Sequence, residues 1–349
     1  MVQKLTRRTA AFSVLGATMV LAGCERGAST DRGRGALIPA AVDTIARQED
    51  GSIGLAADMT VAPDGKLWIA DASNHTLMLF DPRSTGLRSI TREGDGPGEL
   101  RGPQALSANS EGISVLQPLA ARLSRFALDG SFLESRTVPA GALIPVALAA
   151  DSMIAYPSLG LDESLVARVD LHTGERSLLG RALADRPGAM SMSSLRDQAL
   201  RGEYPVEFQN NVFTVVAPDG RVWAISQYTG AITAYGPGGD TAWASALEPD
   251  AVERAHSAYF AGVRENPDRI QVPSLVADAE LVGAELWISI SDGSTGSTLR
   301  RFDRASGEPR GRIDLPGIGG GPFAVSPDGA RLYVIDSHDA VLVSVSLAS

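Results

Sequence analysis

A Pro-Asp-Gly turn recurs three times in this chain, each time inside the same short pattern of residues. The three copies lie at residues 61–69, 216–224 and 325–335, and each turn follows a short apolar segment. The segment after the turn carries an aromatic residue in every copy, namely Trp68, Trp223 and Tyr333. A strand–turn–strand unit that repeats along a chain is typical of a repeat architecture, in which each unit buries its apolar face against the next. The repeat therefore predicts an all-β repeat fold.

A second turn pattern, in which an apolar strand end leads into polar residues and glycine, runs through the same region. Its copies begin at Phe80, Phe126, Val169, Tyr235 and Phe302, and the pattern is typical of hairpins. The last two spacings exceed the first two by 20 residues or more, which predicts two insertions, at 181–208 and 247–271. Without the insertions each unit has about 43 residues, and six units of four strands fill the chain from residue 38 onward.

Both insertions carry helical patterns. In the first, Ser191 is expected to cap a short helix that ends before Gly202, with an apolar face made of Met192, Leu195 and Ala199. In the second, Pro249 lies near the start of a helix that Asn266-Pro267 closes. The apolar face of this second helix comprises Val252, Ala255, Tyr259 and Val263.

The last unit of the chain is one strand short. It has apolar segments at 323–326, 332–336 and 341–347, and then the chain stops. The missing strand is available at residues 41–46, which alternate between apolar and polar side chains. Pairing the two ends would close a ring and remove the exposed sheet edges. We therefore predict an all-β, six-bladed β-propeller of four-stranded blades over 38–349, closed by the N-terminal strand and carrying two short helical insertions.

Two stretches resemble a known repeat family. Residues 70–77 (Ala-Asp-Ala-Ser-Asn-His-Thr-Leu) resemble the core of an NHL repeat, with Thr76 where arginine is more usual. The segment Gly-Asp-Gly-Pro-Gly-Glu-Leu at 94–100 resembles the blade junction of NHL-like six-bladed propellers. The resemblance implies the propeller fold. It implies no activity, because propellers host many unrelated functions.

Residues 1–23 resemble the signal peptide of bacterial lipoproteins. Three positive charges precede a short apolar run at 10–21, and Leu21-Ala22-Gly23-Cys24 resembles the lipobox. In that family the peptide is cut before the cysteine and the thiol is lipidated. An uncleaved membrane anchor is the alternative, but the apolar run is shorter than the roughly 20 residues that spanning needs. Residues 24–37 then form a flexible tether. We expect a lipid-anchored protein of the bacterial cell envelope, on the periplasmic face of the outer membrane or at the cell surface.

Cysteine content and charge restrict the possible partners. Cys24 is the only cysteine, so the propeller has no disulfide, thiol nucleophile or thiolate metal site. Removal of residues 1–23, which carry three positive charges and no acid, takes the formal net charge from −10 to −13. So acidic a chain is repelled by phosphate backbones, and we expect no nucleic-acid partner. We expect a monomer that contacts the membrane only through the lipid on Cys24.

The repeat also assigns each loop to one end of the propeller. The Pro-Asp-Gly turns lie at one end, and the blade-to-blade connections, with both insertions, lie at the other. Insertions in repeat folds gather where the function lies. The candidate residues for binding a ligand or partner at this second end are Asp71, Asn74, His75, Glu99, Arg101, Gln227, Tyr228, Asp336 and His338. A purely structural role is the alternative for each of them. In that alternative Asp71 and Asp336 only accept hydrogen bonds from turn amides, and His75 is a structural histidine.

The sequence contains no recognisable catalytic motif. The four histidines lie far apart in sequence, and there is no nucleophile elbow and no phosphate-binding loop. We expect no cofactor, and the pattern favours a non-catalytic binding module for an envelope protein or a small ligand. The propeller lipoprotein of the outer-membrane barrel assembly machinery offers an analogy of architecture. The alternative is a metal-dependent hydrolase or lyase of the lactonase or amidating-lyase kind, whose metal ligands would come from separate blades.

Overall fold

The computed structural model of the chain describes residues 38–50, 53–84, 86–138, 146–159, 163–185, 191–269, 272–291, 296–337 and 339–348. The expected signal peptide, the tether, Cys24 and the candidate residue His338 lie outside the described residues. In the described part of the chain, no helix is both long enough and apolar enough to cross a membrane.

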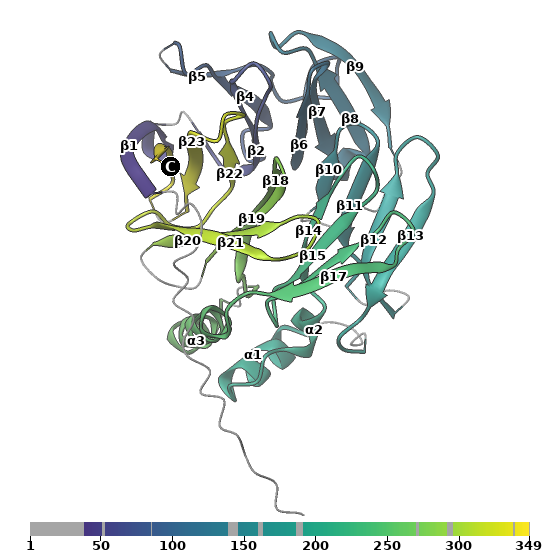
Figure 1. Ribbon diagram of the computed structural model, residues 1–349, viewed down its shortest axis with the longest axis vertical. Coiled ribbons are helices and arrows are strands. Elements are labelled where there is room, and N and C mark those ends of the chain that lie inside the picture. The colour runs from purple at the N-terminus through teal and green to yellow at the C-terminus, as the bar shows by residue number, and fades with distance from the viewer. Residues whose placement is uncertain are drawn as a thin grey trace, which may run out of the picture. The chain divides into compact units, whose positions relative to one another are not determined.

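Six antiparallel sheets of four strands follow one another around a ring, which confirms the predicted six-bladed β-propeller (Figure 1). The innermost strand of each blade contacts the innermost strand of the next, and the last of them, β22, contacts β2 of the first blade. Blade one comprises β2 (Ala56–Val61), β3 (Leu67–Asp71), β4 (Thr76–Phe80) and β5 (Leu87–Ser89). Blade two comprises β6 (Ala105–Asn109), β7 (Gly112–Gln117), β8 (Arg122–Phe126) and β9 (Phe132–Thr137).

The next blades repeat the same order from the axis outward. Blade three comprises β10 (Ala147–Ala149), β11 (Met153–Pro157), β12 (Ser164–Asp170) and β13 (Arg176–Arg181). Blade four comprises β14 (Val212–Val216), β15 (Val222–Ser226), β16 (Ala231–Tyr235) and β17 (Thr241–Ala246). Blade five comprises β18 (Val276–Val282), β19 (Glu285–Ile290), β20 (Ser297–Asp303) and β21 (Pro309–Leu315).

Blade six combines the two ends of the chain. Three strands come from the C-terminal end, β22 (Phe323–Val325), β23 (Arg331–Asp336) and β24 (Val341–Ala348), and the outermost is β1 (Ile38–Arg47). β1 is antiparallel to β24, with Val42 opposite Val345 and Thr44 opposite Val343. The predicted closing strand is therefore confirmed, and it extends beyond 41–46 at both ends.

The three Pro-Asp-Gly turns share one pattern of hydrogen bonds, and the third turn is one residue longer, so that the amide of Ser326 donates to the carbonyl of Arg331. In the first, the amide of Ala62 donates to the carbonyl of Lys66, and the amide of Gly65 donates back to Ala62. The carboxylate of Asp64 accepts from the amide two residues on, and Gly65 has a φ of 84°. A side chain at that φ is strained, which explains why glycine recurs there. The turns at Asp219 and Asp328 repeat the arrangement.

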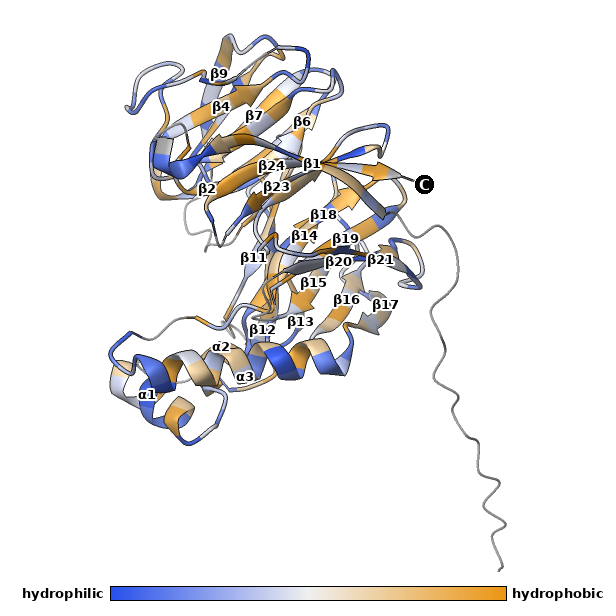
Figure 2. Cartoon of the chain, turned by 90° about the vertical axis from the view of Figure 1, so that its left-hand side faces the viewer, coloured by the Kyte–Doolittle hydropathy of each residue, from blue (hydrophilic) through white to orange (hydrophobic). Residues whose placement is uncertain are grey.

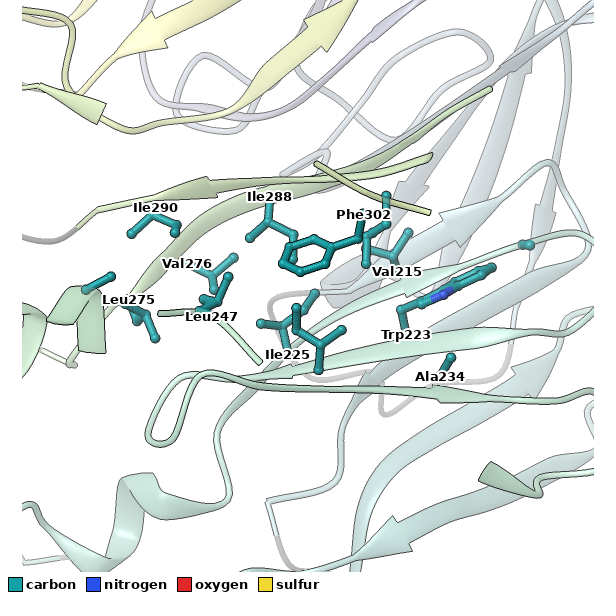
Figure 3. Close-up of a cluster of buried hydrophobic side chains, with 14 residues drawn as sticks. Val215, Trp223, Ile225, Ala234, Leu247, Leu275, Val276, Ile288, Ile290 and Phe302 are labelled. Carbon is teal, nitrogen blue, oxygen red and sulfur yellow. The ribbon is translucent and has the colours of Figure 1, made fainter. Parts of the chain in front are cut away.

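The core consists of apolar side chains packed between neighbouring blades. Between blades four and five, Trp223 lies among Val215, Ile225, Ile288 and Phe302 (Figure 3). The aromatic residues that follow the repeated turns take the same role elsewhere, since Trp68 packs between blades one and two and Tyr333 between blades six and one. All three are almost completely buried. The repeated aromatic position is thus a packing position.

The two insertions contain three helices, α1 (Met192–Leu200), α2 (Val206–Gln209) and α3 (Pro249–Glu265). Ser191 caps α1 and Pro249 begins α3, both as predicted. The prediction differs from the structure in two respects. Met192 is 57% exposed instead of lying on the buried face. The single turn of α2 was not predicted, because four residues are too few to show a helical period.

Candidate functional site

The strand directions divide the connections between two ends of the propeller. We call the end with the Pro-Asp-Gly turns the turn face; it holds the links between the first and second and between the third and fourth strands of each blade. The opposite end, the insertion face, holds the hairpins between the second and third strands and the links between blades. Both insertions are links between blades, after β13 and after β17, so both lie on the insertion face.

The three helices pack together on this face. α1 contacts α3, and Ala199 of α1 is buried with Tyr259 and Val263 of α3. Figures 1 and 2 both show the helices gathered at one end of the fold, beside β12, β13 and β17. The two insertions therefore form one helical layer, which the sequence pattern did not predict, because side chains 60 residues apart have no local signal of contact.

An aromatic cluster joins the helical layer to blade four. The ring centroid of Tyr204 lies 4.6 Å from that of Tyr228 and 4.7 Å from that of His256, and Tyr228 and His256 are stacked. Tyr259 and Phe260 of α3 complete the cluster. Tyr228, one of the predicted binding residues, is therefore part of the packing between the insertions and the hairpin that links β15 to β16.

Three polar atoms in this cluster are buried without a hydrogen-bond partner among the described residues: Tyr204 Oη, Tyr259 Oη and His256 Nε2. Burial raises the pKa of Tyr204 and of Tyr259 above the usual tyrosine value, and it lowers the pKa of His256. A hydrogen bond between His256 and the backbone of Tyr228 opposes the lowering. His256 is therefore held in its neutral form.

The predicted residues of blade one lie together on the insertion face. The buried carboxylate of Asp71 accepts hydrogen bonds from the amide of Gly54, 2.6 Å away, and from the amide and side chain of Asn74. His75 has a φ of 53°, and its Nδ1 accepts from the amide of Gly102, 2.9 Å away, in the next junction. These are the bonds expected from residues that hold turns, which favours the structural alternative for Asp71 and His75.

Glu99 and Arg101 lie in the junction between blades one and two. Glu99 accepts from the amide of Gly96 and pairs with Arg92, and the first of these interactions does most to lower its pKa. The exposed guanidinium of Arg101 lies 3.0 Å from the carboxylate of Asp95. Arg122 crosses from blade two and donates to the carbonyls of Gly94 and Glu99. The junction is thus a closely bonded loop with charged side chains at its surface.

Asp336 and Gln227 hold links between blades. Asp336 accepts from the amide of Gly319, 2.9 Å away, as Asp71 does from Gly54 at the equivalent place in blade one. Gln227 is buried and bonds to the backbone of Leu275 and Val276 at the start of blade five. The structure brings Asp71, Asn74 and His75 together, and Gln227 beside Tyr228, but the candidates that it describes, which exclude His338, do not form a single site.

A cavity of about 500 Å³ lies among the innermost strands of blades one to five. Its lining is mostly apolar, with Leu55, Met59, Leu106 and Phe213 among the larger side chains, and it includes three carboxylates, those of Asp58, Asp278 and Glu280. A largely apolar pocket with a few polar groups is the usual form of a small-molecule site. Sequence reasoning did not name these three residues.

The three carboxylates share one electrostatic environment. Burial raises the pKa of Asp58 and of Glu280 well above the usual values, and the charge of Asp278 raises both further. The pKa of Asp278 rises to about 7, again mainly through burial. Glu280 Oε2 is buried without a hydrogen-bond partner among the described residues. The three carboxyl groups therefore bind protons more tightly than exposed carboxyl groups do.

Asp58 and Asp278 occupy equivalent positions. Each follows a β-bulge in the innermost strand of its blade, after Ala56 and Val276 respectively. Each accepts one amide from the next residue and one from the neighbouring blade. The Ala-Asp pair at 57–58 and 277–278 is the sequence signal that could have found them. Within the described residues, no group of three or more His, Cys, Asp or Glu side chains is arranged to hold a metal ion.

Exposed apolar side chains are concentrated on the insertion face. Among the residues that the structure describes, ten large apolar side chains are strongly exposed; seven of them lie in the connections of the insertion face and none lies in those of the turn face. We call these seven the apolar rim: Leu55, Leu119, Leu159, Leu183, Met192, Leu200 and Val272. Leu119 is 82% exposed, in the turn between β7 and β8.

No protein-family model and no curated protein sequence matches the chain. Among solved structures, it is similar to a Bacteroides fragilis protein described as exported, with 11% identity, 88% of this chain and 95% of that chain covered, and a TM-score of 0.50. It is also similar to the WD40 repeats of RRP9 (11% identity, 84% and 80% covered, TM-score 0.47) and to virginiamycin B lyase from Staphylococcus aureus (13% identity, 86% and 87% covered, TM-score 0.42). These similarities concern the fold.

Proposed function

We propose that this chain is a lipid-anchored binding module of the bacterial cell envelope, which holds a protein or a small ligand on its insertion face. The distribution of the apolar rim carries the proposal. Apolar side chains in contact with water cost free energy that a partner recovers by covering them. The helical layer supports the proposal further, because both insertions lie on the same face as the rim.

The anchor is Cys24, the cysteine of the lipobox-like sequence Leu21-Ala22-Gly23-Cys24. Cys24→Ser should release the protein from membranes into the soluble fraction, because one acyl-bearing residue supplies its membrane affinity. Fractionation of cells after a high-salt wash tests this part. If Cys24→Ser still sediments fully with membranes, the anchor lies elsewhere.

The docking face is tested by site-specific photo-crosslinking in intact cells. A crosslinking amino acid at Leu119 or Leu159 should capture a discrete partner. The same amino acid at Asp64 or Glu308, on the turn face, serves as the matched control and should capture none. Crosslinks from the turn-face positions alone would contradict the proposal.

A second candidate function is a metal-dependent hydrolase or lyase. The observation that favours it is that Asp58, Asp278 and Glu280 line one cavity, because oxygen ligands suit hard divalent cations, although the three are not arranged as a metal site in this structure. The test is metal analysis of the purified protein after dialysis, together with the same analysis of Glu280→Gln. A stoichiometric metal that Glu280→Gln loses would support this second function. A metal content that is the same in both proteins would place any bound metal away from these carboxylates.

A further inference from the structure

The cavity among the innermost strands can be reached from outside. Its lining runs from Leu55 and Gln104, just before β2 and β6, to Pro218 in the second Pro-Asp-Gly turn. Leu55 is 65% exposed on the insertion face, and Pro218 is exposed on the turn face. A volume of about 500 Å³ is within the usual range of small-molecule sites. The cavity can therefore admit a small ligand from solvent.

The lining of this cavity carries acidic groups without a matching cation. Asp58, Asp278 and Glu280 line it, whereas no arginine, lysine or histidine does so among the described residues. Burial favours the protonated forms of the three carboxyl groups. A cation bound beside them would favour the charged forms, because it supplies the opposite charge.

The three carboxyl groups differ in how many of their oxygens are already bonded. Both oxygens of Asp58 and both oxygens of Asp278 accept backbone amides, which join neighbouring blades. Glu280 bonds to the backbone of Val325 in blade six, but its Oε2 is buried without a partner in the part of the chain that the structure describes. A buried oxygen without a donor costs free energy, which a ligand with a donor removes. Glu280 is therefore the acid that has an acceptor to offer.

An organic cation suits the cavity better than a metal ion does. A hard divalent ion needs about six oxygen ligands, and both aspartates already use their oxygens for amides. The apolar side chains of Met59, Leu106 and Phe213 also line the cavity and offer such an ion no ligand. The same side chains suit the apolar body of an organic ligand.

We infer that this cavity binds a small organic cation, whose apolar body contacts Met59, Leu106 and Phe213 and whose ammonium group donates to Glu280 Oε2. A neutral alcohol of the same shape donates a weaker hydrogen bond, and a carboxylate of the same shape is repelled by the acids. The site is separate from the docking face of the proposed function, and neither requires the other.

The test uses the mature chain with Cys24→Ser and probes that differ in charge but share one shape, namely 2-phenylethylamine, 2-phenylethanol and phenylacetate. Hexylamine repeats the measurement with an aliphatic body, and CaCl₂ and MgCl₂ form a separate arm. Isothermal titration calorimetry near neutral pH measures each affinity. We expect at least one of the two amines to bind with 1:1 stoichiometry. The alcohol should bind about tenfold more weakly than 2-phenylethylamine, a difference of about 1.4 kcal/mol, and phenylacetate should not bind.

Matched variants locate the binding, and circular dichroism checks that each of them is folded. Glu280→Gln should weaken amine binding about tenfold or more and change alcohol binding less than about twofold. Ala57→Leu adds bulk to the lining of the cavity and should weaken both. The control is Glu93→Gln, which removes a charge from an exposed side chain on the insertion face and should change neither affinity more than about twofold.

Several results would overturn the inference. They are failure of both amines to bind, equal affinity for 2-phenylethylamine and 2-phenylethanol, or equal weakening of amine binding by Glu93→Gln and Glu280→Gln. Binding of Ca²⁺ or Mg²⁺ alone that Glu280→Gln abolishes would also overturn it, in favour of a metal centre. Crosslinking from Leu119 tests the proposed function separately, so amine binding without such crosslinks would leave this site standing and count against the docking face.

Discussion

The carboxylate of Asp278 accepts a hydrogen bond from the amide of Phe323, 2.8 Å away on the innermost strand of the next blade. The same bond joins Asp58 in blade one to the amide of Leu106 in blade two, at 2.6 Å. Both aspartates line the cavity, so each carboxylate connects two blades at the axis of the ring. The propeller therefore places charge-bearing groups where burial opposes their ionisation, which makes its stability depend on pH.

Glu280→Gln tests this pH dependence. The pKa of Glu280 is raised in the folded chain, so the folded state binds this proton more tightly than the unfolded chain does. The resulting stabilisation is complete below the unfolded value of 4.5 and is lost as the pH rises through the raised value. The melting temperature of the wild type should therefore fall as the pH rises from 5 through the raised pKa, and that of Glu280→Gln should fall less. Above the raised pKa the variant should melt higher than the wild type, by roughly 2 °C for each 1 kcal/mol at this size.

The control for this measurement is Glu253→Gln, which removes a charge from the exposed side of α3. The melting temperature of Glu253→Gln should follow that of the wild type across the whole pH range. If Glu280→Gln and the wild type have parallel melting curves against pH, Glu280 keeps the same proton affinity in the folded and unfolded chain.

Tyr259→Phe should leave the free energy of unfolding unchanged or raise it by up to about 1 kcal/mol. The hydroxyl of Tyr259 is buried without a partner among the described residues, and removal of an unsatisfied polar group avoids its desolvation cost. Tyr259→Ala should instead lose about 3–5 kcal/mol, because it leaves a cavity between α1 and α3. Urea unfolding measures both. A loss above about 1 kcal/mol in Tyr259→Phe would show that an ordered water or another molecule bonds the hydroxyl.

Deletion of Ile38–Arg47 should destabilise the protein far more than deletion of residues 25–35. The first deletion removes β1, which pairs with β24 along its length, and leaves an exposed sheet edge on blade six. The second deletion removes none of the described residues. Differential scanning calorimetry of the two truncated proteins measures the contrast, and equal melting temperatures would contradict closure of the ring by β1.

Asp219→Ala should lower the free energy of unfolding by about 1 kcal/mol without affecting partner binding. Asp219 accepts the amide of Arg221 in the second Pro-Asp-Gly turn and pairs with its guanidinium at 2.7 Å, on the turn face. Asp219→Asn keeps a side-chain oxygen that accepts from the Arg221 amide, so its free energy of unfolding should fall by less. Urea unfolding together with crosslinking from Leu119 separates the two effects, and loss of the crosslink in a folded Asp219→Ala would place the turn face in binding.

Helices in the insertions were predictable to different degrees. Ser191 and Pro249 are local signals, so the starts of α1 and α3 could be predicted from neighbouring residues. The exposure of Met192 could not be predicted from the sequence, because it depends on which side of α1 faces α3. The candidate residues Asp71 and Gln227 were placed on the correct face, but the amides that they bond come from residues 17 and 48 positions away.

The sequence by itself determined the number of blades, the Pro-Asp-Gly turns, the aromatic packing positions and closure by the N-terminal strand. All of these follow from short-range patterns that recur at each blade, and repetition makes such patterns visible. Only the tertiary structure decided which polar side chains meet. Asp58 lies 220 residues from Asp278, and Tyr204 lies 52 residues from His256, yet ring closure and helix packing bring each pair together. Contact across such separations depends on the geometry of the whole ring, which no local pattern of residues encodes.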